Sequence, residues 1–184
     1  EMRLEPFCSH FGICGGCKWQ ILPYEMQLKA KEAQVYDQLS RIGHLELPEI
    51  QPIIPSDKRT EYRNKLEFTA SNRRWLLEGE DADSLSPTLM CGLGFHIEKF
   101  FDKVLDIKEC HLQREPSNEI RIFLKKFALN HDIPFYDIRA NTGILRTLIV
   151  RTTESGSVMV IVCFADDFPE RAKMLETLSI RFPQ

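Results

Sequence analysis

Three cysteines within ten residues constrain this chain more than any other feature of its sequence. Cys8, Cys14 and Cys17 follow the spacing C-x5-C-x2-C, and glycines stand at positions 12, 15 and 16 between them. Thiolates packed this closely repel one another unless a metal neutralises them, and glycines let the backbone fold tightly around an inorganic centre. The motif therefore predicts a metal site. Its spacing suits an iron–sulfur cluster and equally a structural zinc ion with a distant fourth ligand, and disulfides rank last.

Three further cysteines are available as the fourth ligand. Cys91 and Cys163 lie in apolar, strand-like runs, where a thiol is usually a small core residue. Cys110 instead follows Lys108 and Glu109 at a polar junction, which suits a sulfur presented to a remote loop; the alternative is a partly exposed thiol. The histidines at positions 10, 96 and 111 are possible zinc ligands, but an isolated histidine is more often a surface or hydrogen-bonded residue.

The composition excludes several classes of protein. The 184 residues are 43% hydrophobic and 28% charged, which is enough for a packed core of ordinary size. No run of about eighteen apolar residues and no apolar signal segment is present, which predicts a cytoplasmic protein without a membrane partner. Six cysteines in a reducing compartment bind metals more often than each other. A net charge of −3 means that nucleic-acid binding would need a local basic patch or a part outside this chain.

Periodicity predicts an α+β fold with a mainly antiparallel sheet and a few helices, plus an N-terminal cysteine-rich loop and an amphipathic helix. Helices are expected over 24–42, from Ser117 as N-cap to about 128, and over 169–178 with Ala172, Leu175 and Leu178 inward. Alternation predicts strands over 62–70, 89–97, 145–153 and 158–164, and shorter ones at 75–77 and 101–107. The apolar stripe of the first helix is expected to pack on a core or to dock on another domain.

Several separate motifs resemble those of one known family. They are Cys8-x5-Cys14-Gly-Gly-Cys17-x-Trp19-Gln20, Tyr24-Glu25-x-Gln27-Leu28-x-x-Lys31, Arg41-Ile42-Gly43, Tyr62-Arg63-Asn64-Lys65-x-Glu67-Phe68, Gly94-Phe95-His96, Asp106-Ile-x-x-Cys110-x-Leu112-Gln113 and Leu145-Arg146-Thr147-Leu148. Together they look like the RNA (uracil-5-)-methyltransferases, in the branch that carries a [4Fe–4S] cluster and methylates 23S ribosomal RNA. The resemblance runs in order over most of the chain. It implies that Cys8, Cys14, Cys17 and Cys110 are the four cluster ligands.

In that family a C-terminal Rossmann-type domain binds S-adenosylmethionine. It supplies a cysteine that adds to C6 of uracil and a base that removes the C5 proton. This chain has no glycine-rich cofactor loop and no Pro-Pro-Arg nucleophile motif, so no catalytic residue is expected in it. The resemblance implies a cluster loop at 1–22, a helix at 23–44 that docks on the catalytic domain, and a central α+β domain at 45–184. We expect the chain alone to be inactive, its partners being ribosomal RNA and a C-terminal methyltransferase domain in the same polypeptide. Because methyl transfer needs no electron, a structural role is expected for the cluster.

Six basic residues within seventeen, interleaved with Tyr62 and Trp75, form the expected RNA-contacting stretch. They are Lys58, Arg59, Arg63, Lys65, Arg73 and Arg74. Basic side chains neutralise phosphates, and aromatic faces stack on unpaired bases. By their pattern alone these residues are better explained as a solvated strand face and turn. The resemblance makes Arg63 and Lys65 the expected contacts near a base flipped out of the RNA, and the other four phosphate contacts.

A zinc-binding, non-enzymatic RNA-interaction module is the competing hypothesis, in which the cysteines hold zinc and the basic stretch binds RNA. A third class, a radical or electron-transfer iron–sulfur protein, fits less well because the chain has one cluster motif and lacks the C-x3-C-x2-C pattern. Metal content distinguishes the first two hypotheses.

Overall fold

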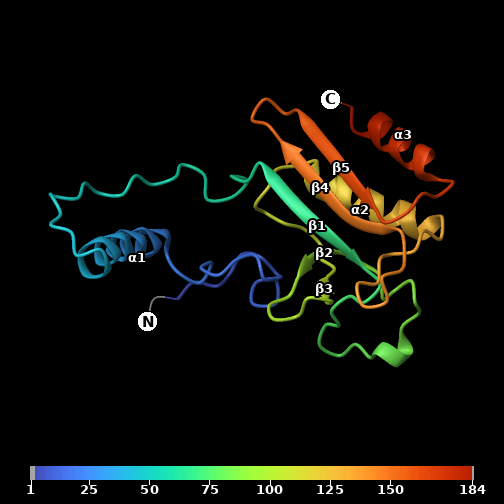
Figure 1. Cartoon of the computed structure of the whole chain (residues 1–184), viewed down its shortest axis with the longest axis horizontal. Helices are drawn as coiled ribbons and strands as arrows, with labels where there is room; N and C mark the ends of the chain where they lie inside the picture. Colours follow the sequence, from blue (N-terminus) through green and yellow to red (C-terminus); the bar gives the residue numbers. More distant parts are fainter. Residues whose placement is uncertain (1–2, 184) are drawn as a thin grey trace. The chain divides into compact units, whose positions relative to one another are not determined.

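The computed structural model describes residues 3–183. The chain divides into two compact units (Figure 1). Unit 1 takes Glu1–Phe11 and Cys17–Arg59, and unit 2 takes Gly12–Gly16 and Thr60–Gln184. The cysteine motif is therefore divided between the units.

Unit 1 is built on helix α1 (Tyr24–Asp37), which continues as the π-helical turn η1 (Gln38–Ile42). This confirms the helix expected over 24–42. The segment that follows has no regular structure up to residue 57, and it is tied back to the helix by two hydrogen bonds. The backbone N–H of Ser56 donates to the Tyr24 hydroxyl (2.7 Å), and that of Ile53 donates to the Glu32 carboxylate (3.0 Å). No residue of α1 or η1 is buried, so the expected packing of its apolar stripe on a core is not found within the described residues.

Unit 2 contains a five-stranded antiparallel sheet in the order β3-β2-β1-β4-β5. Its strands are β1 (Lys65–Ser71), β2 (Gly92–His96), β3 (Val104–Leu105), β4 (Leu145–Thr152) and β5 (Val158–Phe164). Alternation in β1 buries Leu66, Phe68 and Ala70 on one face and leaves Lys65 and Glu67 exposed on the other. Strands β4 and β5 form the expected hairpin, with Gly156 at φ +96° in its turn.

Helices α2 (Ser117–Asn130) and α3 (Arg171–Arg181) complete unit 2. Figure 1 shows α2 behind the sheet, where it packs against β4 and β2 and against α3. Phe68, Leu93 and Leu148 from the sheet share one core with Leu124 of α2 and Met174 of α3. The predicted α+β class with an antiparallel sheet is confirmed. No helix in residues 3–183 is long and apolar enough to cross a membrane.

Three local predictions were wrong. No strand forms at 75–77, where Arg74 makes only an isolated bridge to Val104. Ser117 is the first residue of α2 rather than its N-cap, and its buried hydroxyl donates to the side chain of Gln113. In α3, Met174 is buried with Leu178, whereas Ala172 and Leu175 are exposed. Short apolar patterns leave the helical phase ambiguous, and contact with α2 selects one of the possible faces.

Candidate functional site

The backbone next to Cys14 is closely packed at Gly15. Cys14 pairs with Ile97 in an isolated antiparallel bridge of unit 2. A Cβ atom added at Gly15 would lie 3.0 Å from the carbonyl oxygen of His96, and one at Gly16 would lie 3.5 Å from the Cys14 sulfur. The absence of a side chain at Gly15 therefore allows the Cys14 segment to approach the backbone of His96 closely.

Cys110 is held at the start of helix α2. Its backbone N–H donates to the Asn118 side-chain oxygen (2.8 Å), and its carbonyl oxygen accepts from the Asn118 amide nitrogen (3.3 Å). Asn118 itself is buried and is oriented by the Glu115 carboxylate, to which its Nδ2 donates at 2.8 Å. Like Cys14, Cys110 is half-buried against the core of unit 2. The expected polar junction is thus a rigid loop clamped to a helix.

Cys8 and Cys17 belong to unit 1. The backbone N–H of Cys8 donates to the Gln20 side chain (3.2 Å), and its carbonyl oxygen accepts from Phe11 N–H (3.0 Å), which closes a tight turn. Both cysteines have half-buried side chains. Access is therefore partial at all four predicted ligands.

The donor set fits a thiolate-bound metal or cluster in its chemistry. The four predicted ligands are all cysteines, two in each unit, and glycines surround one of them. Within either unit, over residues 3–183, no group of three His, Cys, Asp or Glu side chains is arranged to hold a metal ion. The four-cysteine ligand set therefore stays a prediction.

The remaining cysteines and histidines have other surroundings. The Cys91 thiol donates to the Pro87 carbonyl (3.5 Å), and burial raises the pKa of this thiol, as befits a small packed residue. Cys163 lies opposite Thr147 on the sheet face turned away from the core. His96 is exposed, His10 is buried, and His111 lies 3.5 Å from the Glu109 carboxylate.

Four of the six predicted RNA-contacting residues lie in unit 2, on either side of β1. Arg63 and Lys65 stand at the start of β1, whereas Arg73 and Arg74 follow its end, separated by about 20 Å of strand. Lys58 and Arg59 belong to unit 1. There the Arg59 guanidinium lies 4.5 Å from the centre of the Tyr24 ring and 3.4 Å from the Glu25 carboxylate.

Arg74 is occupied by an ion pair within unit 2. Its two terminal nitrogens each donate to Glu80 at 2.7 Å, and its Nε donates to the Leu89 carbonyl at 2.6 Å. Hydrogen bonds from Arg74 and from the backbone N–H of Leu77 lower the pKa of Glu80 to about 2. These hydrogen bonds fix the loop that follows β1, so Arg74 has a structural role.

Arg73 has a similar partner in Asp137. Its Nε donates to the nearly buried carboxylate at 3.3 Å. Asp137 also accepts from the backbone N–H of Ala140 and from the Asn72 side chain, and these bonds lower its pKa to about 2. Arg73 itself is exposed, so one face of its guanidinium stays accessible.

The start of β1 presents several exposed basic residues of unit 2. Lys65 lies directly opposite Arg151 of β4 on the face of the sheet that α2 does not cover, and both side chains are exposed. Like charges facing each other across two strands destabilise a sheet, and the Glu67 carboxylate, 3.9 Å from the Lys65 ammonium, offsets part of this repulsion. Arg63 and Tyr62 precede Lys65 and are exposed, and the Arg63 backbone N–H is anchored to the Leu112 carbonyl (2.8 Å).

Arg151 was not singled out from the sequence. It falls in the run correctly expected as a strand, but its position beside Lys65 depends on the register between two strands 80 residues apart. Arg121 was also missed. It lies one turn before Leu124 on the buried face of α2, where a charged residue is unusual, and that departure from the apolar pattern was a usable signal.

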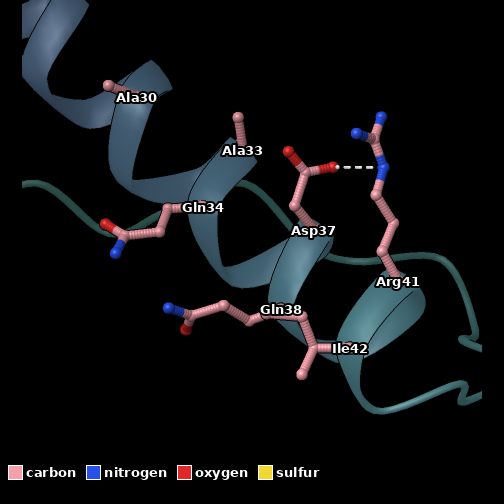
Figure 2. A pocket seen from close by; sticks show the side chains of 7 residues that line it. All are labelled: Ala30, Ala33, Gln34, Asp37, Gln38, Arg41 and Ile42. Carbon is pink, nitrogen blue, oxygen red and sulfur yellow. Dashed lines mark ion pairs between the residues drawn. The ribbon is translucent and has the colours of Figure 1, made fainter.

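A hollow of about 420 Å³ lies along α1 and η1. Figure 2 shows its lining, in which the Asp37–Arg41 ion pair (3.2 Å) lies beside two alanines, two glutamines and one isoleucine. The lining residues are Ala30, Ala33, Gln34, Asp37, Gln38, Arg41 and Ile42. Apart from the Asp37–Arg41 pair no ionisable group lines it, so the hollow suits packing better than catalysis.

Comparison with known proteins gives relatives for nearly the whole chain. An uncharacterized RNA methyltransferase from Porphyromonas gingivalis is 52% identical over 190 residues, which cover 100% of this chain and 41% of that protein. Another from Bacteroides thetaiotaomicron is 46% identical over 192 residues, covering 95% and 42%. No family model matches the chain.

A solved structure is also similar. The crystal structure of Pyrococcus abyssi tRNA (uracil-54, C5)-methyltransferase in complex with S-adenosyl-L-homocysteine aligns with a TM-score of 0.62 at 26% identity. The alignment covers 94% of this chain and 35% of that one. The chain therefore spans well under half the length of the relatives it matches.

Proposed function

We propose that this chain is the cluster-binding and RNA-contacting part of an S-adenosylmethionine-dependent RNA uracil-C5 methyltransferase. The observation that carries the proposal is the similarity, over nearly all of its length, to RNA methyltransferases and to a solved uracil-C5 enzyme. The similar proteins are more than twice as long, which leaves room for a separate catalytic domain.

In this proposal Cys8, Cys14, Cys17 and Cys110 hold a [4Fe–4S] cluster. The half-buried, glycine-lined Cys14 and the clamped Cys110 loop support it, because thiolates on stiff backbone suit a resident cluster. The cluster supplies a cross-link between distant parts of the chain, which removes unfolded-state freedom.

RNA binding falls to the exposed basic group at the start of β1. Lys65 and Arg151 face each other and offer two positive charges to one phosphate, while Arg63 and Tyr62 are placed for contacts to an unstacked base. S-adenosylmethionine supplies the methyl group and would be bound by the domain outside this chain. In this proposal the basic residues and Tyr62 at the start of β1 bind and orient the RNA. Arg74 is assigned to the Glu80 ion pair instead.

Helix α1 and η1 are proposed to dock on that methyltransferase domain. Their side chains include exposed Val35, Leu39 and Ile42, and Ile42 also lines the hollow of Figure 2. An apolar helix face with no buried residue is costly in water, and the additional length of the relatives provides an occupant in the same polypeptide.

We further propose 23S ribosomal RNA as the substrate, on the strength of the cysteine motif. The similar structure is of a tRNA enzyme, so transfer RNA is the competing substrate. Full-length protein with S-adenosylmethionine carrying a labelled methyl group is expected to label 23S RNA fragments at C5 of a uridine. Labelling of tRNA alone would overturn the ribosomal assignment and leave the reaction class intact.

Metal analysis tests the core of the proposal. Anaerobically purified full-length protein is expected to contain about four irons and four sulfides per chain, both lost in Cys110→Ala. Cys163→Ala is the matched control, because this half-buried thiol faces away from the core, and it should keep the full iron content. Retention of iron in Cys110→Ala would remove that residue from the ligand set.

A zinc-binding RNA module is the second candidate, since an all-cysteine donor set suits zinc as well. One zinc and no sulfide per chain would favour it and would remove the cluster from the proposal.

A further inference from the structure

The deepest charge in unit 2 is the guanidinium of Arg121 on helix α2. Its side chain is only 2% exposed. One terminal nitrogen donates to the Leu93 carbonyl at 3.2 Å and the other to the Lys108 carbonyl at 2.7 Å. The buried Nε has no hydrogen-bond partner among the described residues. A full positive charge is therefore held in the core with neutral partners only.

No carboxylate in residues 3–183 forms an ion pair with Arg121. The two acidic residues that influence it are engaged elsewhere, Asp106 with Lys125 and Glu115 with the Asn118 side chain. Burial lowers the pKa of Arg121, while Asp106, Cys110 and Glu115 act against that change. Burying a charge without a direct ion pair is unfavourable, so a further anion close to Arg121 would be stabilising.

The loop that carries Cys110 is fastened to the same face of α2. Asn118 binds the backbone N–H and carbonyl of Cys110, and Arg121, one turn later, binds the carbonyl of Lys108. Residues three apart in a helix lie side by side, so the guanidinium and Asn118 together hold the loop. The Cys110 thiol is close enough to act electrostatically on the guanidinium.

We propose that Arg121 is the buried counter-charge of the iron–sulfur cluster at Cys110. This inference rests on the proposed cluster. Four thiolates leave a [4Fe–4S] cluster with net negative charge, and one-electron reduction adds a further negative charge. A fixed cation in a region of low dielectric stabilises both states, and the reduced state more.

Two substitutions separate charge from shape. Arg121→Gln keeps a hydrogen-bond donor but is neutral, whereas Arg121→Lys keeps the charge with fewer donors. Lys126→Met, an exposed cation on the same helix, is the control for a distant and screened charge. The full-length protein is purified anaerobically, and its iron, sulfide, reduction potential and rate of cluster loss to an iron chelator are measured.

The reduction potential of Arg121→Gln is expected to be more negative than that of wild type, and its cluster is expected to be lost at least several-fold faster. Arg121→Lys should lie close to wild type on both measures, and Lys126→Met should match wild type. Loss of the cluster in Arg121→Gln but not in Arg121→Lys also supports the inference.

Equal reduction potentials in Arg121→Gln and Arg121→Lys, or loss of the cluster from both, would mean that Arg121 only holds two carbonyl groups in place. Either result would overturn this inference and leave the proposed cluster standing. A wild-type protein without iron and sulfide would overturn the proposed cluster itself, and the inference with it.

Discussion

Two helices of equal length, α1 and α2, have opposite surroundings. Both contain 14 residues, yet α1 buries none of them and α2 buries seven. The apolar residues of α2 meet the sheet of unit 2, whereas those of α1 and η1, such as Val35 and Ile42, are exposed. Amphipathic spacing thus identifies a face that needs a partner but does not say whether the partner lies in the same folded unit.

The largest expected effect on stability is in α2, the buried helix of the two. Leu124→Ala in α2 removes a fully buried side chain and should lower the free energy of unfolding by about 2–5 kcal/mol. Leu39→Ala in η1 is the matched control and should cost less than about 0.5 kcal/mol, because this side chain is already exposed. Urea unfolding followed by circular dichroism measures both. Equal losses of unfolding free energy would mean that η1 is packed in solution, and that the two helices do not differ in burial.

Acid should weaken unit 2 through carboxylates of lowered pKa, among them Glu80 and Asp137. Glu80 and Asp137 both have folded-state pKa values of about 2, so the unfolded chain binds more protons than the folded one between about pH 4.5 and 2. The free energy of unfolding is therefore expected to fall as pH decreases through this window. Unfolding measured from pH 6 to 2 should show less of this decrease in Glu80→Gln. If the free energy of unfolding of Glu80→Gln fell with pH as much as that of wild type, the Arg74–Glu80 ion pair would not contribute to the loss of stability in acid.

The two faces of the sheet should differ in RNA binding. Lys65→Ala and Arg151→Ala on the open face are each expected to weaken binding of single-stranded RNA several-fold and to reduce the salt slope by about 0.7. Lys126→Ala on α2, which covers the other face, is the control and should change neither. Binding curves at several salt concentrations provide the test. A similar loss of RNA affinity in all three variants would indicate general electrostatic attraction rather than a defined binding surface.

The smallest effect is expected on α1. The Asp37–Arg41 pair spans one turn at 3.2 Å, with 79% of the Arg41 side chain exposed. Arg41→Ala should therefore lower the free energy of unfolding by no more than about 0.5 kcal/mol. Thermal or urea unfolding at low and high salt measures it. A loss above 1 kcal/mol would show that this end of the helix, which lines the hollow of Figure 2, is packed rather than exposed.

The sequence pattern predicted correctly those helices and strands whose structure depends on their own residues alone. The helix over 24–42, the β4–β5 hairpin and the alternating burial of Leu66 and Phe68 are confirmed, since each follows from spacing within one segment. The 75–77 strand and the inward face of α3 were wrong because neighbouring elements, not the segments themselves, decided them.

The candidate site divides in the same way. The sequence by itself determined which residues have the right chemistry: three cysteines in a spacing suited to a metal, and basic residues beside an aromatic one. Only the tertiary structure decided that Arg74 is bound to Glu80, that Arg151 stands beside Lys65, and that Arg121 is buried next to the Cys110 loop. Residue chemistry is carried by the individual side chain, whereas charge compensation depends on groups far apart in the chain, which only the register of strands and the packing of helices bring together.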